Sequence, residues 1–403
     1  MKKIDGGVCA AQGFLASGIH AGIRKNKTKR DLALIYSQAP AAAAAVYTQN
    51  LVKGAPITVT KSHLSDGRAQ AVICNSGNAN TCNADGPEVA EKMCALTGAR
   101  LGISSSDVIV ASTGVIGQKL DITPIEAGMD ELCQGLGRDG GPAAEAIMTT
   151  DTRKKEAAVE FTIGGKTCRL GGMAKGSGMI HPNMATMLVF VTCDAAITPK
   201  ALQKALSADV QTSFNMITVD GDTSTNDMLC ILSNGMAGNR VIGESGEDFN
   251  TFCAALHDVT VTLCKMIAGD GEGASKLIEC AVSGADTDQA ARTAARAVVG
   301  SSLVKAAMFG SDANWGRVLC AIGYSGADVD VNRIGVWFES VAGRVKVCEN
   351  GAGVDFSEEE ALEILKEPEV TIRVSLGYGK CEATAWGCDL TYDYVKINGD
   401  YRT

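Results

Sequence analysis

The chain has 403 residues, of which 46% are hydrophobic and 21% charged, and its net charge is −9. This length predicts at least two hydrophobic cores, and the apolar content excludes an intrinsically disordered chain. The acidic balance, with basic residues clustered only at 24–30, argues against nucleic acid as a partner.

The N-terminus and the cysteines point to a soluble cytosolic protein. Asp5, Gly6 and Gly7 follow the first lysines where a signal peptide needs an apolar core, and no apolar run reaches the roughly 18 to 20 residues that cross a bilayer. The fifteen cysteines contain no C-x-x-C pair and no zinc spacing with the four histidines. We therefore expect reduced, mostly buried cysteines, no metal site and no membrane contact.

The first half of the chain predicts strands separated by helices. Residues 86–102 read as a helix that begins with Pro87 in its first turn and ends on Gly98 or Gly102. Runs rich in β-branched residues predict strands at 32–36, 70–75, 107–113, 157–165 and 187–194.

The second half predicts amphipathic helices followed by sheet. Apolar residues recur every three or four positions at 198–214, 245–269 and 286–310. The segment 355–367 has a capping box, with Ser357 at the cap and Glu360 three residues later, and 369–399 alternates like an antiparallel sheet.

These patterns favour a mixed α/β architecture without a regular βαβ repeat, in which stacked mixed sheets are flanked by helices. The weakest joint lies near 282–288, where a strand pattern gives way to a polar turn and a new helix. We therefore predict a larger unit at 1–283 and a smaller α/β unit at 284–403.

Two glycine-rich stretches resemble phosphate loops but fail the spacing. The sequence "GGKT" at 164–167 has Glu160 where the loop needs its first glycine, so a hairpin turn is predicted. The stretch "GDGEGASK" at 269–276 follows a helix where the dinucleotide fingerprint needs a strand. It reads as a helix-to-strand turn with an exposed Glu272, although its glycines would also let a ligand approach the backbone.

The segment "MIHPNMATMLVF" at 179–190 places Thr186 directly after Ala185 at the start of an apolar run. A threonine hydroxyl needs a nearby base, and a free α-amine on the same residue supplies one if the preceding peptide bond is cut. With a reference pKa of about 7.7 to 8.0, such an amine is partly neutral in the cytosol. The spacing alone favours an ordinary loop that enters a buried strand.

The whole chain resembles the ornithine acetyltransferase family of glutamate N-acetyltransferases. The stretch "KGSGMIHPNMATML" resembles the self-cleavage signature of that family. Further matches follow in order along the chain: "GIHAGIRKNKTKRDLALI", "CNSGNANTC", "ASTGVIG", "IMTTDT", "DGDTSTND", "AGDGEGASKLIE", "FGSDANWGRV" and "YVKINGDYRT".

The resemblance implies cleavage between Ala185 and Thr186, which gives an α fragment of residues 1–185 and a β fragment that begins at Thr186. It implies transfer of acetyl from N2-acetyl-L-ornithine to L-glutamate in arginine biosynthesis, by a ping-pong route through an acetyl ester of Thr186. Thr113 and Gly114 of "ASTGVIG" would form the oxyanion hole.

The same resemblance implies a substrate pocket in an α2β2 assembly that needs no cofactor. Charge complementarity assigns Lys175 to the substrate carboxylate and Glu272 to the ornithine ammonium. The implied pocket residues are Thr149 or Thr150, between which the sequence does not choose, with Lys175, Thr186, Glu272, Asn398 and Thr403. Whether acetyl-CoA is also a co-substrate, as in some members of the family, stays open.

Two other hypotheses fit parts of the pattern. An aminopeptidase or amidase with an N-terminal nucleophile would hydrolyse acetylornithine without glutamate. A metabolite-binding protein would keep its chain uncut.

Overall fold

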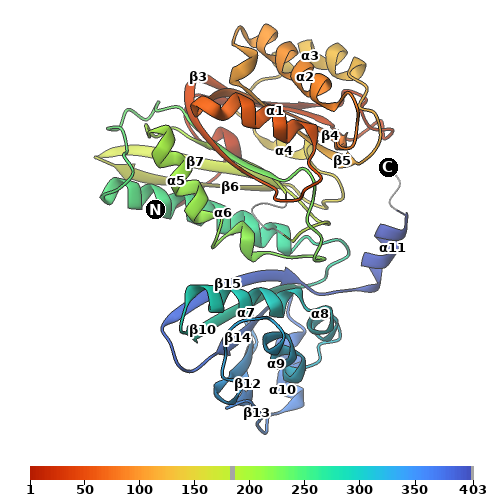
Figure 1. The fold of residues 1–403 in the computed structure, drawn as a ribbon, viewed down its shortest axis with the longest axis vertical. Helices are drawn as coiled ribbons and strands as arrows, with labels where there is room; N and C mark the ends of the chain where they lie inside the picture. Colours follow the sequence, from red (N-terminus) through yellow and green to blue (C-terminus); the bar gives the residue numbers. More distant parts are fainter. Residues whose placement is uncertain (182–186, 401–403) are drawn as a thin grey trace.

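The computed structural model describes residues 1–181 and 187–400. Figure 1 shows two parts stacked along the long axis, each built on a sheet. The sheet of the larger part has nine strands and that of the smaller part has six. Both sheets mix parallel and antiparallel pairs and carry helices. The predicted mixed α/β architecture is confirmed.

The larger sheet runs in the order β1-β6-β7-β8-β9-β3-β4-β5, with β2 paired to β3. Its strands are β1 Lys2–Ile4, β2 Phe14–Ile19, β3 Leu32–Tyr47, β4 Arg68–Asn78, β5 Val108–Val115, β6 Lys155–Ile163, β7 Lys166–Lys175, β8 Leu188–Cys193 and β9 Met228–Ser233. All five predicted strands of this half of the chain are present, and the hairpin predicted at 164–165 joins β6 to β7.

The long strand β3 joins two halves of this sheet that stack on each other. It pairs with β4 through Leu32–Ala42 and with β9 through Ala42–Tyr47, with a shift of register between Tyr36 and Ala41. Ile35 of β3 packs with Phe190 of β8 in an inner core between the halves. This arrangement gives the predicted stack of sheet on sheet.

Helices cover both outer faces of the stack. The first group packs on β2 to β5 around Leu34 and Met93, and the second packs on β3, β6 and β7 around Val46 and Phe252. The first group is α1 Ala55–His63, α2 Gly86–Leu101 and α3 Thr123–Gln134; the second is α5 Pro199–Asp209 and α6 Glu247–Ala268. The short helix α4, Gly141–Ala146, packs in the inner core.

The smaller sheet has the order β13-β12-β11-β14-β10-β15. Its strands are β10 Leu277–Ala285, β11 Gly335–Ser340, β12 Gly343–Glu349, β13 Ala352–Gly353, β14 Glu369–Ser375 and β15 Cys381–Cys388. The helices of this part are α7 Asp288–Gly300, α8 Ser302–Phe309, α9 Trp315–Gly323, α10 Glu358–Leu365 and α11 Tyr392–Asp400.

The antiparallel sheet predicted for 369–399 is wrong in two respects. The strands β14 and β15 do not pair with each other, because β10 lies between them, parallel to β14 and antiparallel to β15. The last predicted strand is the helix α11. Alternation of apolar and polar residues indicates that a segment is extended, but the rest of the fold decides which strand it pairs with.

The ends of two further helices can be compared with the sequence prediction. The helix predicted for 286–310 is two helices, because the chain leaves helical geometry at Ser301, whose hydroxyl accepts the Val304 N–H and caps α8. At α10 the Ser357 hydroxyl accepts the Glu360 N–H, as the capping box predicts.

The boundary predicted at 283/284 falls inside β10, all of which belongs to the smaller sheet. The chain passes from one sheet to the other between Ser233 and Leu277, a stretch that contains α6. One continuous core joins α6 residues such as Phe252 to β10 and α7 of the smaller part. The division into two units therefore stays a prediction.

Among the described residues, α6 is the one helix long and apolar enough to pass a test for a membrane span. It lies against β6 and β7 with Phe252, Leu256 and Leu263 buried, as a core helix does. All fifteen cysteines lie in the described part of the chain, and each is a free thiol.

Candidate active site

One pocket gathers the predicted site residues that the structure describes. It has a volume of about 140 Å³ and lies where the ends of β5 and β7 meet the turns after α4 and α6, the loop before β9, and α11. Its lining comprises Ala79, Thr113, Gly114, Ile116, Thr149, Thr150, Lys175, Gly178, Met179, Ser224, Thr225, Asn226, Glu272 and Asn398. The predicted Ala185, Thr186 and Thr403 lie outside the described residues.

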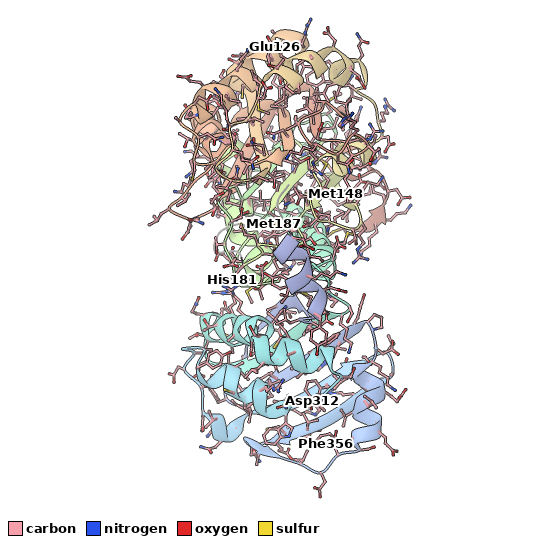
Figure 2. All side chains as sticks on the ribbon, turned by 90° about the vertical axis from the view of Figure 1, so that its right-hand side faces the viewer. Glu126, Met148, His181, Met187, Asp312 and Phe356 are labelled. Carbon is pink, nitrogen blue, oxygen red and sulfur yellow. The ribbon has the colours of Figure 1, made fainter. Side chains whose placement is uncertain are left out.

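The figures show how distant segments meet at this pocket. The helix α11 leaves the smaller sheet and extends toward the larger part (Figure 1). Met148, which precedes the pocket residue Thr149, lies in the larger part together with Met187, and His181 lies near the junction with the smaller part (Figure 2). Segments from both fragments of a chain cut after residue 185 therefore line one pocket.

The end of β5 brings Thr113 and Gly114 to the pocket. Gly114 has φ 135°, and a Cβ there would lie 2.3 Å from the carbonyl carbon of Gly77 and 2.5 Å from the nitrogen of Asn78. Only glycine fits such a close approach to β4. Lys175 Nζ donates to Thr113 Oγ1 over 3.3 Å, so the hydroxyl hydrogen of Thr113 can be directed at a ligand.

Lys175 ends β7 with only 8% of its surface exposed, which contradicts a surface position for this charge. The carboxylate of Asp151 lies close behind it and accepts the Gly176 N–H over 2.7 Å. Burial raises the pKa of Asp151, but Lys155 and Lys175 outweigh burial and hold that pKa below its ordinary value. Asp151 is therefore an anion that supports the cationic side of the pocket.

Glu272 supplies the anionic side. It lies in the predicted turn between α6 and β10, but it is buried, so the interpretation as an exposed turn residue is wrong. Its N–H donates to the Ser177 carbonyl over 2.9 Å, and Asn398 Nδ2 of α11 donates to its Oε2 over 2.7 Å. A Cβ on Gly178 would lie 2.4 Å from the Glu272 carboxyl carbon, so this backbone packs directly on the carboxylate.

Thr149 and Thr150 both line the pocket, and the choice between them stays open. Both lie in the turn after α4 and are half-buried. The Thr149 N–H donates to Asp151 Oδ2 over 3.0 Å, which ties this turn to the carboxylate behind Lys175.

The sequence interpretation missed a buried group of three charges behind the pocket. Lys155 Nζ lies 2.6 Å from Asp151 Oδ1 and 2.5 Å from Asp270 Oδ2, and all three side chains are almost fully buried. Asp270 also accepts the Thr152 N–H over 3.1 Å. These contacts join β6 to the turns that carry Thr149, Thr150 and Glu272. Asp151 belongs to the motif "IMTTDT" and Asp270 to the motif "AGDGEGASKLIE". These motifs are the sequence signal that could have pointed to the two aspartates.

Asn226 is a second residue that the sequence interpretation missed, although it lies in the motif "DGDTSTND". Its Nδ2 donates to the carbonyls of Ala79 and Ser112 over 2.5 and 3.0 Å, and its Oδ1 accepts the Thr81 hydroxyl over 2.6 Å. Asn226 therefore fastens the end of β5, where the predicted oxyanion hole lies.

A larger cavity of about 860 Å³ lies between the smaller sheet and α6. It is lined by Trp337, Glu339, Arg373 and Trp386 among others, and by none of the predicted site residues. The small pocket is the better match to the sequence, because amino-acid substrates need less room than the roughly 300 Å³ or more of sites for drug-sized ligands.

The fold and the pocket define an α/β protein in which strand ends of the larger sheet, the turns beside them and α11 line a small site with one buried cation and one buried anion. A family model described as the ArgJ family matches residues 15–403. The chain therefore belongs to the ArgJ family.

Curated relatives support this membership over the full length. The chain is 54% identical to the arginine biosynthesis bifunctional protein ArgJ of Symbiobacterium thermophilum, with 100% of both chains covered. It is 48% identical to the protein of the same name from Bacillus subtilis, covering 100% of this chain and 98% of the relative. The crystal structure of the Bacillus halodurans protein of that name is 49% identical, covers 53% of this chain and 98% of its own, and has a TM-score of 0.50.

Proposed function

We propose that this chain is a self-cleaving glutamate N-acetyltransferase of arginine biosynthesis that moves acetyl from N2-acetyl-L-ornithine to L-glutamate. The observation that carries the proposal is the pocket in which Thr113, Gly114, Lys175, Glu272 and Asn398 meet from four separate segments. Membership of a family whose relatives are named bifunctional arginine biosynthesis proteins supports the pathway and the acyltransferase class.

The first step is self-cleavage. The Thr186 hydroxyl attacks the Ala185 carbonyl carbon, the C–N bond between them breaks, and an ester forms as the Thr186 amine is released. Water then hydrolyses the ester and leaves Ala185 with a carboxylate. The freed amine can accept the proton of its own hydroxyl in the following reaction.

The transfer has two half-reactions on Thr186. In the first, its hydroxyl attacks the acetyl carbonyl, ornithine leaves with the proton from the α-amine of Thr186, and an acetyl ester remains. In the second, the neutral α-amine of glutamate attacks that ester and the Thr186 hydroxyl is restored. Each half-reaction passes through an oxyanion, for which we assign the Thr113 hydroxyl and the Gly114 N–H as donors.

Charge complementarity assigns the substrate contacts. Lys175 binds the substrate carboxylate, and Glu272 binds the side-chain ammonium of acetylornithine, with Asn398 holding the Glu272 carboxylate in place. Either Thr149 or Thr150 adds a hydroxyl, and Thr186 and Thr403 complete the proposed site. We further propose that acetyl-CoA is a second acetyl donor, that the cytosolic enzyme needs no metal or organic cofactor, and that two α and two β fragments assemble.

Intact mass and N-terminal sequencing of the purified protein test the first step. We expect two fragments, the second beginning Thr-Met-Leu-Val, and an uncut chain in Thr186→Ala. An active enzyme with an unbroken bond between Ala185 and Thr186 would contradict the proposal.

Assays with defined acceptors and donors test the transfer. Acetylornithine with glutamate should yield N-acetylglutamate, whereas steady hydrolysis of acetylornithine without glutamate would indicate an amidase instead. Acetyl-CoA with glutamate tests the second donor, and light scattering of the native enzyme tests the assembly.

A further inference from the structure

The turn that precedes the proposed cleavage site is held by two other segments. From the turn after α6, the Glu272 N–H donates to the Ser177 carbonyl, and the Asp270 carbonyl accepts the Ser177 hydroxyl over 2.7 Å. From the loop 218–223, the Val219 N–H donates to the Ile180 carbonyl over 2.7 Å. The Thr223 hydroxyl donates to the His181 carbonyl over 2.8 Å.

Asp220 lies at the centre of this loop, and its carboxylate accepts four hydrogen bonds. Oδ2 accepts the Met179 N–H over 2.6 Å and the Tyr394 hydroxyl of α11 over 3.3 Å. Oδ1 accepts the Ile180 N–H over 2.9 Å and the Asp222 N–H over 3.2 Å. Asp220 itself is not among the residues that line the pocket.

The two backbone contacts act on a strained residue. Met179 has φ 56°, in the left-handed region that residues other than glycine rarely adopt. Consecutive N–H groups that converge on one carboxylate stabilise a backbone of this kind, because the anion binds both donors at once. Asp220 thus supports the conformation that places Gly178 and Met179 in the pocket lining.

The position of the turn matters because only five residues separate His181 from Met187. On the far side, the Met187 carbonyl accepts the Met228 N–H over 2.8 Å, which ties Met187 to the start of β9. Both described residues that flank the segment of the proposed cut are therefore held by hydrogen bonds to other parts of the chain.

We propose that Asp220 is a positioning residue for self-cleavage: its carboxylate holds the turn at Met179 and Ile180, which leads into the segment of the proposed cut, and so raises the rate of cleavage. The proposal rests on the proposed function. Through Tyr394, the same carboxylate also fastens α11, which carries Asn398.

The test follows the fraction of uncut chain at fixed times after cell-free synthesis of the full-length protein, on a denaturing gel. Asp220→Asn should lower the rate of self-cleavage by about tenfold or more, because the amide has one acceptor oxygen and cannot bind both backbone donors. The matched control is Asp222→Asn, which removes the same charge from an exposed residue two positions away and should be cut at the wild-type rate.

A rescue separates positioning from a general loss of stability. Met179→Gly removes the cost of the left-handed conformation, so the Asp220→Asn, Met179→Gly double variant should regain cleavage speed relative to Asp220→Asn alone. Tyr394→Phe removes only the contact to α11, so it should be cut at the wild-type rate and raise the KM for acetylornithine.

The outcomes are distinguishable. Asp220→Asn cut as fast as wild type, or a double variant as slow as the single one, would overturn the role of Asp220 while leaving the proposed function intact. A wild-type chain that stays uncut in the same assay would overturn the proposed function itself.

Discussion

Lys175 and Glu272 lie in one small pocket without an ion pair to each other among the contacts of the described residues. Lys175 instead contacts Thr113, and Glu272 contacts Asn398. These uncharged partners leave each charge able to bind an opposite charge on a ligand. Keeping two buried charges apart costs solvation free energy, which a zwitterionic ligand would recover on binding.

Replacing Lys175 with methionine should therefore weaken the enzyme by loss of a charged hydrogen bond to the substrate. We expect kcat/KM for acetylornithine to fall about tenfold to hundredfold, which corresponds to roughly 1.5 to 3 kcal/mol. Steady-state kinetics measure the change. Lys92→Met, at an exposed ion pair on α2, is the control and should leave kcat/KM unchanged; an equal loss in both variants would contradict the assignment.

Gly114 offers a test of local packing at the same site. Gly114→Ala should lower the free energy of unfolding by about 1 to 3 kcal/mol for the clash, added to the strain of a positive φ. Gly117→Ala is a matched control, since Gly117 also has a positive φ, 76°, but no atom lies within 4 Å of the added Cβ. Urea unfolding of both variants gives the difference, and equal destabilisation would show that the contact with Gly77 matters little.

At the scale of elements, the buried group of Lys155, Asp151 and Asp270 joins β6 to the two turns behind the pocket. The folded-state pKa of Asp151 lies below its ordinary value of 3.8. Asp151 therefore contributes stability at pH above that value, and the contribution is lost as the pH falls from 3.8 through the lower folded pKa.

Lys155→Met should reverse this pH dependence. Without Lys155, the burial that raises the pKa of Asp151 is less opposed, so the variant should lose about 3 to 5 kcal/mol of stability near neutral pH and recover part of it on acidification toward pH 5. Urea unfolding at pH 8 and pH 5 measures both effects. A loss of the same size at both pH values would indicate a packing defect rather than unpaired charge.

The helix α11 joins the pocket through few contacts. It has no buried residue, and its links to the rest of the chain include Asn398 to Glu272 and Tyr394 to Asp220. Most of the free energy of folding comes from burial of apolar surface, so α11 should contribute little to stability and much to the site.

A chain that ends after Leu390 should accordingly unfold at nearly the wild-type temperature but lose activity by about a hundredfold or more, because Asn398 no longer orients the Glu272 carboxylate. Calorimetry and kinetics on the same preparation give the two values. Val395→Ser, at a position that is 70% exposed on α11, should change neither. A truncated chain with full activity would remove α11 from the site.

For the whole molecule, the proposed cut falls between strands that stay paired. The strand β7 of the α fragment pairs with β8 of the β fragment from Leu170 to Lys175, and β3 pairs with β9 from Ala42 to Tyr47. Both ladders lie within shared cores, so the two fragments form one folded unit.

The processed fragments should therefore elute together in native size-exclusion chromatography. They should separate only at urea concentrations that unfold the protein. Mass spectrometry of the eluted peak identifies both fragments, and a urea series locates the separation. Two separate peaks in buffer without urea would contradict the prediction that the pairing of β7 with β8 holds the fragments together after cleavage.

Sequence patterns predicted individual elements best where the pattern is local. The helix at 86–102 and the strands at 70–75 and 107–113 were predicted because the residues that indicate them lie within each segment or at its ends. The run of alanines in the second half of β3 was missed, since alanine has a low strand propensity and tertiary pairing with β9 decides its conformation. For the site, the family motifs singled out residues of which the described ones line one pocket. The same motifs contain Asp151, Asp220 and Asn226, but the roles of these three depend on contacts to distant backbone groups.

The sequence by itself determined which chemical groups are available: a threonine within a stretch that resembles a self-cleavage signature, a lysine and a glutamate between glycines, and glycines where backbones must approach closely. Only the tertiary structure decided that these groups share a pocket, that Glu272 is buried rather than exposed, and that β10 separates β14 from β15. The physical reason is that burial and strand pairing depend on contacts between segments far apart in the chain, which no local pattern of residues encodes.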